Sequence, residues 1–222
     1  MTRRPQASGK KGSQKWIQKL INEEPELLNS EIRKNLQLSK DECIKWLSPL
    51  EKDEYAEYRD QDFIDLLCVK LEKLTLEDFW PMRGPQWDAL EKSSRGKLFL
   101  VEAKSHISEL ISTLGAKDDS AEIIRKSLEK TKCFLNSKSK TDWSQGFYQY
   151  ANRLAHLWLL RQNKLPAYLI FVYFLKDAEV KGPTTVHEWK GAIKLVHSYL
   201  GIGRHKLQRY VVEVFIDVNC FT

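Results

Sequence analysis

The first fifty residues carry apolar side chains at helical spacing. Three short helices are predicted here, and they begin near Ser13, Pro25 and Ser39. A serine before such a run favours a helix start because its hydroxyl can cap free backbone N–H groups. The apolar positions that carry the pattern are Trp16, Ile17, Leu20, Ile21, Leu27, Leu28, Ile32, Ile44, Trp46 and Leu47. Residues 14–50 are therefore predicted to form a helical extension.

Helical and strand patterns alternate through the remainder of the chain. The predicted elements are a long helix over 52–74, strands over 86–91 and 97–103 joined by a hairpin loop at 93–96, a helix over 119–135, a helix from Asp142 or Ser144 to about 162, a strand over 167–175, a helix over 187–200 and a strand over 210–217. The run 167–175 is apolar on both faces, which is typical of a central strand. This order predicts an α/β fold with a mixed sheet flanked by helices.

The composition indicates a folded chain. Its 222 residues are 42% hydrophobic and 30% charged, which suits one domain with a sizeable core and an extension. No stretch approaches about 18 consecutive apolar residues, and the first residues lack the apolar region of a secretory signal. We therefore expect no membrane span and a cytoplasmic location. The four cysteines form no CxxC pair and are expected to be buried or partly buried free thiols.

The net charge of +6 is concentrated at the N-terminus. Residues 1–19 hold six of the 36 basic residues and no acid, which leaves 30 basic against 30 acidic residues in the remainder. Residues 1–13 are expected to be a disordered basic tail. Such a tail can bind phosphate groups, although it can equally be a solvated segment. The candidate nucleic-acid-binding residues are Arg3, Arg4, Lys10, Lys11, Lys15 and Lys19.

Acidic and basic side chains lie at the end of an otherwise apolar strand. Glu102 and Lys104 are two positions apart, so they point to the same face of the predicted strand 97–103. Asp88, on the hairpin partner, can bring a second carboxylate beside Glu102. Two carboxylates with open positions suit Mg²⁺, and Lys104 beside them could assist an attacking water. A surface ion-pair group at a sheet edge is the plain structural alternative.

This arrangement resembles the signature of the PD-(D/E)XK nuclease superfamily, in Asp88 followed by Glu102-Ala103-Lys104. The resemblance implies a restriction-endonuclease-like αβββαβ core within residues 51–222, if part of 74–80 supplies the first strand. It also implies a nuclease that uses Mg²⁺, or Mn²⁺ in its place, to cleave nucleic acid, with DNA favoured. Asp88 and Glu102 would be the metal ligands and Lys104 would assist the water. The sequence departs from the signature at Gln86-Trp87-Asp88, since the proline stands three positions earlier.

Two further residues are candidates for the same site. In related nucleases the helix after the (D/E)xK strand often lends a polar side chain, and Gln149 is our candidate. The QxxxY pattern of one branch is not met, because the chain has QxxxQ from Gln145 and QxxxR from Gln149. The helix before the strands often lends a carboxylate, and there we choose Glu57, with Asp60 as second choice. For each of these side chains, a solvated helical face is an alternative.

Three readings of function stay open on the sequence. The first is the metal-dependent nuclease. The second is a catalytically inactive nuclease-fold module that binds nucleic acid or another protein. The third is an unrelated α/β protein in which ExK occurs by chance. The sequence does not specify DNA or RNA, single or double strands, exo- or endonucleolytic cleavage, or whether the chain forms a homo-oligomer.

Overall fold

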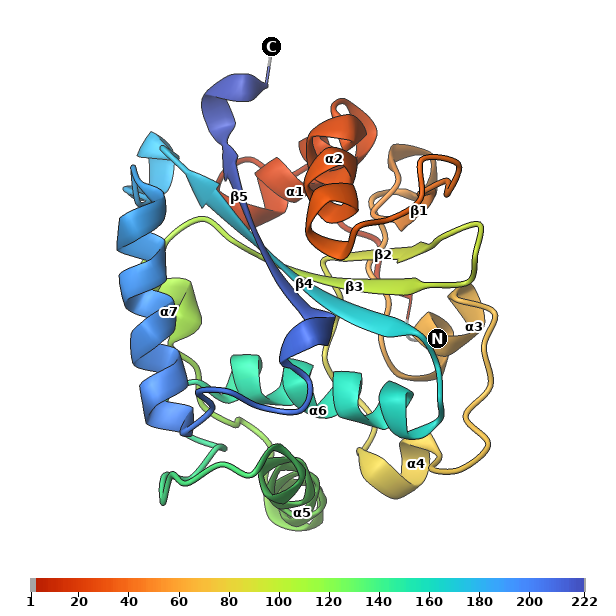
Figure 1. Cartoon of the computed structure of the whole chain (residues 1–222), viewed down its shortest axis with the longest axis vertical. Helices are drawn as coiled ribbons and strands as arrows, with labels where there is room; N and C mark the ends of the chain where they lie inside the picture. Colours follow the sequence, from red (N-terminus) through yellow and green to blue (C-terminus); the bar gives the residue numbers. More distant parts are fainter. Residues whose placement is uncertain (1–2, 222) are drawn as a thin grey trace.

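A single mixed sheet forms the centre of the computed structural model, which describes residues 3–221 (Figure 1). Its strand order is β1-β2-β3-β4-β5; the β1/β2 and β2/β3 pairs are antiparallel, and the β3/β4 and β4/β5 pairs are parallel. The strands are β1 Trp46–Ser48, β2 Ala89–Lys92, β3 Leu98–Lys104, β4 Ala167–Leu175 and β5 Val211–Asp217. The predicted α/β class with a mixed sheet is therefore confirmed.

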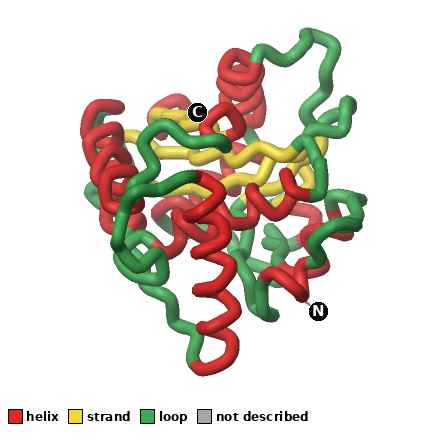
Figure 2. Tube along the Cα trace, turned by 60° about the horizontal axis from the view of Figure 1, so that its bottom comes forward, coloured by secondary structure: helices red, strands yellow, loops and turns green. Residues whose placement is uncertain are grey.

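Helices cover both faces of this sheet. Figure 1 shows α1 and α2 on one side and α5 and α6 on the other, and Figure 2 shows the strands as a layer between helices. The helices are α1 Gly12–Asn22, α2 Pro25–Leu36, α3 Asp60–Leu66, α4 Leu76–Phe79, α5 Asp118–Leu135, α6 Tyr148–Gln162 and α7 Val186–Leu200. No helix within residues 3–221 has the length and apolar character that a membrane span requires.

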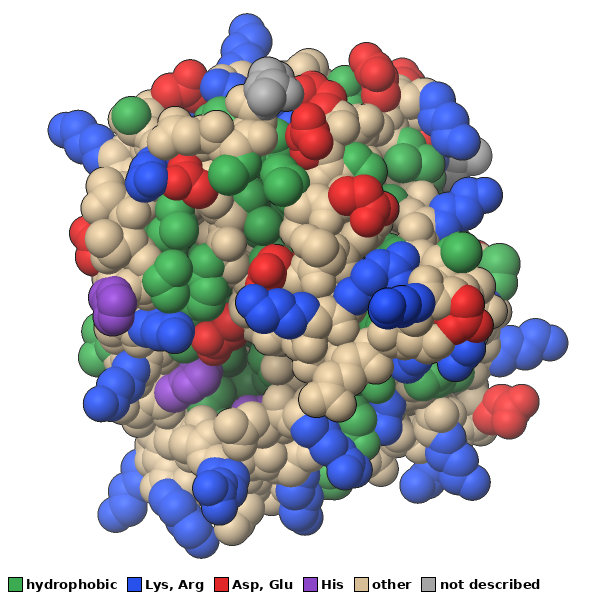
Figure 3. Space-filling view, turned by 45° about the horizontal axis from the view of Figure 1, so that its top comes forward, with side chains coloured by type: hydrophobic (Ala, Val, Ile, Leu, Met, Phe, Trp, Pro, Cys, Tyr) green, Lys and Arg blue, Asp and Glu red, His purple; other side chains and the backbone are tan. Residues whose placement is uncertain are grey.

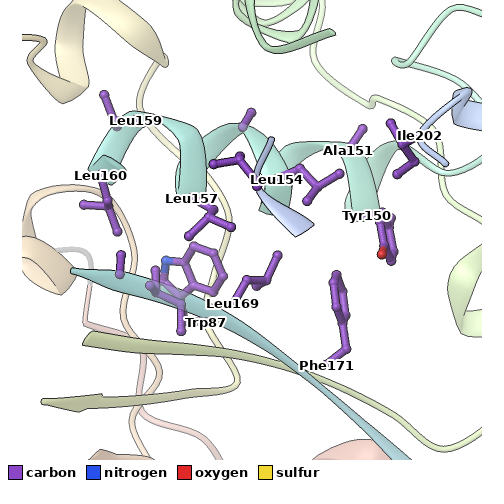
Figure 4. Packing of buried hydrophobic residues seen from close by; sticks show 14 of the residues in the cluster. Trp87, Tyr150, Ala151, Leu154, Leu157, Leu159, Leu160, Leu169, Phe171 and Ile202 are labelled. Carbon is purple, nitrogen blue, oxygen red and sulfur yellow. The ribbon is translucent and has the colours of Figure 1, made fainter. Parts of the chain in front are cut away.

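Side-chain alternation along β3 divides the core into two clusters. Leu98 and Leu100 belong to the cluster that packs against α6, whereas Phe99 and Val101 belong to the cluster that packs against α1 and α2. Residues of β4 alternate in the same way, and eight of its nine are buried, as expected for an interior strand. Figure 4 shows Leu154 and Leu157 of α6 pointing toward Leu169 and Trp87. The even-numbered face of β3 is thus the face that α6 covers.

The helix predicted to follow Ser39 is wrong. Trp46 and Ser48 instead pair with Glu91 and Leu90 of β2. The Trp46 indole Nε1 donates a hydrogen bond to Asn29 Oδ1 of α2 at 3.0 Å. Pairing with β2 satisfies backbone groups across 45 positions of sequence, and this long-range gain overrides the local helical spacing.

The long helix predicted over 52–74 is also wrong, because the only α-helix there is α3, and a short 3-10 turn at Glu51–Asp53 precedes it. Glu54, Tyr55 and Cys68 have positive φ values of 53°, 49° and 51°, which the interior of a right-handed helix cannot accommodate. Tyr58 forms an isolated antiparallel bridge with Trp87 instead. The segment is therefore a short helix between extended stretches that pair with distant parts of the chain.

Several boundaries differ from prediction. Residues 74–80 supply no strand, since α4 occupies them and Thr75 Oγ1 accepts its capping bond from Asp78 N at 3.1 Å. The strand predicted over 86–91 is β2 at 89–92, and the helix predicted from 142 or 144 begins at Tyr148. The four cysteines are free thiols as predicted, but the predicted burial is wrong, because Cys43, Cys68, Cys133 and Cys220 are all exposed. The remaining predicted helices and strands are confirmed to within about two residues.

The N-terminal segment lies against the body of the chain. Arg4 and Glu57 exchange two backbone hydrogen bonds, at 2.9 and 3.0 Å. Gln6 N donates to Glu54 O at 2.9 Å, and Arg3 N donates to Asp62 Oδ2 at 2.6 Å. Residues 1 and 2 of the predicted disordered tail lie outside the described residues. From residue 3 onward the segment has defined partners, and these partners flank Glu57.

Candidate active site

Glu102 and Lys104 end the α6-facing row of β3 side chains. Strand alternation extends the row from Leu98 and Leu100 to both of them, so they share a face as the spacing predicts. Lys104 Nζ donates a hydrogen bond to Glu102 Oε1 at 2.5 Å. Both side chains are buried, with 9% and 2% of the side-chain surface exposed for Lys104 and Glu102. The structure therefore places this ion pair inside the α6-facing layer, and the alternative of an exposed pair at a sheet edge does not describe it.

Asp88 immediately precedes β2 and lies beside the same strand. Its backbone N–H donates to Val101 O at 3.2 Å, so the residue continues the β2/β3 pairing. Its Oδ2 accepts a hydrogen bond from Ala103 N at 2.7 Å. The carboxylate of Asp88 is thereby fixed next to the backbone that joins Glu102 to Lys104.

Gln149 reaches the pair from the first turn of α6. Its Oε1 accepts a hydrogen bond from Lys104 Nζ at 2.9 Å. Its backbone N–H donates to Ser112 Oγ at 2.8 Å, which anchors the start of the helix. Gln145 lies before the helix and is exposed, and His156 is buried among aromatic rings. Of the polar residues spaced along this helix, Gln149 is therefore the one that contacts Lys104.

Glu57 approaches from the extended segment before α3 rather than from a helix. Gln86 Nε2 donates to Glu57 Oε2 at 2.6 Å, and Gln6 Nε2 donates to the same oxygen at 3.3 Å. Arg4 Nη1 contacts Gln86 Oε1 at 3.2 Å, so the N-terminal segment supports this arrangement. Asp60, the second choice, instead accepts bonds from the backbone of Arg83 and Gly84 at 3.0 and 2.7 Å. Asp60 therefore stabilises a loop.

Arg153 is a site residue that the sequence analysis did not select. Its Nε donates to Glu102 Oε2 at 2.5 Å and its Nη2 donates to Gln86 O at 2.7 Å. Its guanidinium carbon lies 4.7 Å from the centre of the Trp87 ring. The Glu102 carboxylate is consequently held by one cation on each oxygen. The spacing of four between Gln149 and Arg153, which puts both on one helix face, was the available signal.

The carboxylates at this site have pKa values that their surroundings shift in opposite directions. Burial raises the pKa of Asp88 well above its usual range, and the charges of Glu102 and Glu57 raise it further. Burial also raises the pKa of Glu57 to about 7, against a lowering by the Gln86 hydrogen bond. For Glu102 burial acts in the same direction, but Arg153 and Lys104 outweigh it and hold the pKa below its usual value. Asp88 and Glu57 therefore hold a proton more readily than an exposed carboxyl does, whereas Glu102 holds one less readily.

The donor chemistry of these three acids fits a divalent cation. Oxygen ligands suit Mg²⁺, and a cation between repelling carboxylates would favour their ionised forms. As they stand, no group of three or more His, Cys, Asp and Glu side chains within residues 3–221 has the arrangement of a metal site. The charges of Glu102 and Asp88 both act on Lys104, and Glu57 lies within electrostatic range of both carboxylates.

The basic residues proposed for nucleic-acid binding fall into two groups. Arg3 pairs with Asp53 at 2.8 Å, Lys15 with Glu179 at 2.9 Å and Lys19 with Glu23 at 3.4 Å. The side chains of Lys10 and Lys11 are exposed. Arg4 is exposed as well, and it contacts Gln86. The charge of the first group is therefore largely matched by acids of the same chain.

A polar groove lies along β5, and Tyr150 is the residue of α6 that lines it. It has a volume of about 590 Å³ and is lined by residues that include Tyr150, Lys190, His197, Arg209 and Glu213. Tyr150, next to Gln149, contacts His197 Nε2 through its hydroxyl at 2.8 Å. Figure 3 shows a hollow bordered by histidine, Lys or Arg, and acidic side chains on one face of the molecule. None of the candidate site residues lines this groove.

Comparison with known proteins adds no family to this description. Searches of family models, of curated proteins and of solved structures found no match to the chain.

Proposed function

We propose that this chain is a metal-dependent nuclease that hydrolyses phosphodiester bonds in nucleic acid, with DNA as the favoured substrate. The observation that carries the proposal is the convergence of Glu57, Asp88, Glu102, Lys104 and Gln149. These residues come from four separate segments of the chain, and they meet around one buried ion pair. A chance ExK sequence would not be expected to gather further carboxylates and an amide around itself.

In this proposal Asp88 and Glu102 hold Mg²⁺, which Mn²⁺ can replace, and Glu57 adds a third carboxylate nearby. When bound, the ion would supply Lewis-acid polarisation of a phosphate oxygen and activation of a water molecule. The contribution of the chain itself is to keep the acids in place. Ala103 N fixes Asp88, and Gln86 fixes Glu57.

Lys104 acts as a cation in this proposal and not as a base. Burial alone would lower its pKa, but the charges of Glu102 and Asp88 outweigh burial and raise the pKa above its usual value. The ammonium group therefore keeps its proton at neutral pH. It can donate hydrogen bonds to a phosphate oxygen and stabilise the negative charge that develops there. Gln149 orients the same ammonium by accepting one of its hydrogen bonds.

The strand arrangement supports a restriction-endonuclease-like core as part of the proposal. β1, β2 and β3 are antiparallel neighbours, and α5 and α6 connect β3 to the parallel strand β4. One feature departs from the expected αβββαβ order, because α3 and α4 lie between β1 and β2. The core assignment thus depends on β2 to β4 more than on β1.

A catalytically inactive module is the second candidate, and Arg153 is the observation that favours it. Its side chain is 3% exposed and contacts the Glu102 oxygen that Lys104 does not. A protein cation at this position could neutralise Glu102 without any metal. Such a module would bind nucleic acid or a protein partner through the same face and cleave nothing.

Cleavage assays separate the two candidates. Wild type and the double variant Glu102→Gln, Lys104→Ala are incubated with plasmid, linear and single-stranded DNA and with RNA, with Mg²⁺ or Mn²⁺. Metal-dependent cleavage by wild type alone supports the nuclease. Equal traces of cleavage in both preparations, or none in either, contradict it and favour the module.

A further inference from the structure

The chain from α7 to the start of β5 carries basic side chains and no acidic ones. Residues 189–212 contain five Lys and Arg residues and no Asp or Glu. The five are Lys190, Lys194, Arg204, Lys206 and Arg209, and all of them are exposed. None of the ion pairs formed within residues 3–221 includes any of them. Ion pairs therefore do not neutralise the charge here, in contrast to the paired cations near the N-terminus.

Two pairs of these like charges are held close together. Lys190 and Lys194 are four positions apart on α7, a spacing that puts them on one helix face, where like charges repel. The guanidinium of Arg209 lies 4.8 Å from the centre of the Tyr210 ring, and that of Arg161 lies 3.6 Å from the same centre. An anion bound at either pair would relieve the repulsion within it.

The groove along β5 brings cations of two separate segments to one hollow. Lys190 and His197 of α7 line it, together with His205 and Arg209 of the segment that leads into β5. The acid in this lining is Glu213, on which the charge of Lys190 acts. Figure 3 shows Lys and Arg side chains along the edge of the molecule below the hollow. The groove therefore has a predominantly cationic rim.

This groove lies beside the candidate active site in the sheet. Glu102 of β3 pairs in register with Phe171 of β4, and Phe171 pairs with Glu213 of β5. Neighbouring strands are about 4.8 Å apart, so the backbone of Glu213 lies roughly 10 Å from that of Glu102. The Tyr150 ring stacks on Phe171 with 4.4 Å between ring centres, and its hydroxyl contacts His197. Tyr150 and Phe171 thus separate the groove from the site by one layer of rings.

We propose that the exposed cations of residues 189–212, here called the α7–β5 surface, bind the phosphate backbone of the nucleic acid substrate. The inference rests on the proposed nuclease function and names the surface that holds the substrate. A polynucleotide carries a phosphate at every nucleotide, so a strand whose scissile phosphate lies at Lys104 has further phosphates at the distance of this groove. Arginine can bind a phosphate through two N–H groups at once. An acidic protein would need carboxylates placed to match these cations, whereas regular phosphate spacing is a property of any strand.

The test is the affinity of the full chain for labelled duplex and single-stranded DNA, measured by fluorescence anisotropy with EDTA present so that nothing is cleaved. The triple variant Lys190→Gln, Lys194→Gln, Arg209→Gln removes three charges of the α7–β5 surface. On duplex DNA it is expected to lower the magnitude of the slope of log affinity against log salt concentration by about 2.7. The affinity itself is expected to fall about tenfold or more.

The matched control removes one arginine and two lysines from α5. The variant Arg125→Gln, Lys126→Gln, Lys130→Gln changes three exposed residues, and it is expected to bind DNA as wild type does. Circular dichroism checks that each variant is folded. If the first triple variant does not fold, Lys190→Gln, Lys194→Gln still decides the inference, with an expected loss of about 1.8 in the slope.

The other outcomes distinguish this inference from the nuclease proposal. Equal affinities in the two triple variants overturn the role of the α7–β5 surface and leave the nuclease intact. A selective loss in the first variant, in a protein that cleaves nothing, supports the surface and overturns the nuclease in favour of the binding module. Wild type that binds polyglutamate but neither DNA nor RNA overturns both and assigns the surface to an acidic protein. Wild type that binds none of these polymers overturns both as well.

Discussion

Lys104 Nζ lies 2.5 Å from Oε1 of Glu102, two positions earlier on the same face of β3. Each group makes burial of the other possible, since a buried charge without a partner is strongly unfavourable. The Lys104 ammonium therefore has two roles. It stabilises the buried Glu102 carboxylate, and in the proposed reaction it would donate a hydrogen bond to a phosphate oxygen.

Removing the ammonium should abolish cleavage. Lys104→Ala is expected to lower the rate of phosphodiester hydrolysis by about 100-fold or more, because a preorganised donor to the developing charge is lost. Single-turnover cleavage of labelled DNA in Mg²⁺ measures the effect. Lys126→Ala, an exposed lysine of α5 paired with Glu122, is the control and should cleave as wild type does. Equal rates in all three proteins would contradict the assignment.

Loss of the Glu102 carboxylate should destabilise the fold. Glu102→Ala leaves Lys104 and Arg153 buried without their common partner, and we expect the free energy of unfolding to fall by about 3–5 kcal/mol. Urea denaturation followed by tryptophan fluorescence measures it. Glu122→Ala breaks a solvent-exposed pair and should change stability little. If both variants unfolded at the same urea concentration, the contacts of Glu102 with Lys104 and Arg153 would not stabilise the fold as expected.

The shared face of Glu102 and Lys104 could be predicted because side-chain alternation is a property of any extended backbone. The helices α1, α2, α5 and α7 could be predicted for a similar reason, since their periodicity is local. The segment around Tyr58 could not, because its pairing with Trp87 is formed between residues distant in sequence. The apolar residues there do follow helical spacing, but the long-range backbone pairing determines the conformation instead.

Arg153 shows the same limit within the site. Nothing near it in the sequence indicates that its partner is Glu102, 51 positions away. The proximity of Asp88 to Glu102 could be predicted from the sequence only because a hairpin brings near neighbours in sequence together. Gln149 could be chosen because of the resemblance to a nuclease signature. The contacts by which Gln86 and Arg4 support Glu57 could be identified only from the structure.

The raised pKa of Glu57 predicts a decline of stability with pH. The carboxyl has a pKa of about 7 in the folded chain and 4.5 when unperturbed, so between these values the folded state holds a proton that the unfolded state has released. Stability contributed by this group is therefore lost as the pH rises from 4.5 to 7. Glu57→Gln should flatten this decline, by an amount on the order of 1–3 kcal/mol between pH 5 and pH 7.5.

Urea unfolding at a series of pH values measures that slope. Glu91 has a pKa raised to about 8 by its burial, so the decline that remains in Glu57→Gln should continue to that pH. Glu122→Gln is the control, because Lys126 lowers the pKa of Glu122 and its proton is released in both states over this range. An unchanged slope in Glu57→Gln would show that Glu57 is not the group that titrates.

Gln149 should matter to the reaction more than to the fold. Gln149→Ala removes the hydrogen bond that orients Lys104, and a bond to a charged group is worth about 1.5–3 kcal/mol, so cleavage should fall roughly 10- to 100-fold. Gln145→Ala changes an exposed glutamine just before the same helix and should have no effect. A loss of folding in Gln149→Ala, seen by circular dichroism, would assign Gln149 a structural role instead.

The N-terminal cations should contribute unequally to nucleic-acid binding. Lys10 and Lys11 are exposed, whereas Lys15 and Lys19 form ion pairs with Glu179 and Glu23. A cation that already has a carboxylate partner must give up that contact before it can neutralise a phosphate, so it releases fewer counterions per residue on binding. Each contact between an unpaired cation and a phosphate adds about 0.9 to the magnitude of the slope of log affinity against log salt concentration.

The double variant Lys10→Ala, Lys11→Ala should therefore lower the magnitude of the slope by about 1.8 on duplex DNA, measured by fluorescence anisotropy between 50 and 200 mM salt. The matched double variant Lys15→Ala, Lys19→Ala should lower it by less. A larger loss in the second variant than in the first would show that the ion pairs open on binding and that the basic helix α1, and not the segment before it, contacts the backbone of the nucleic acid.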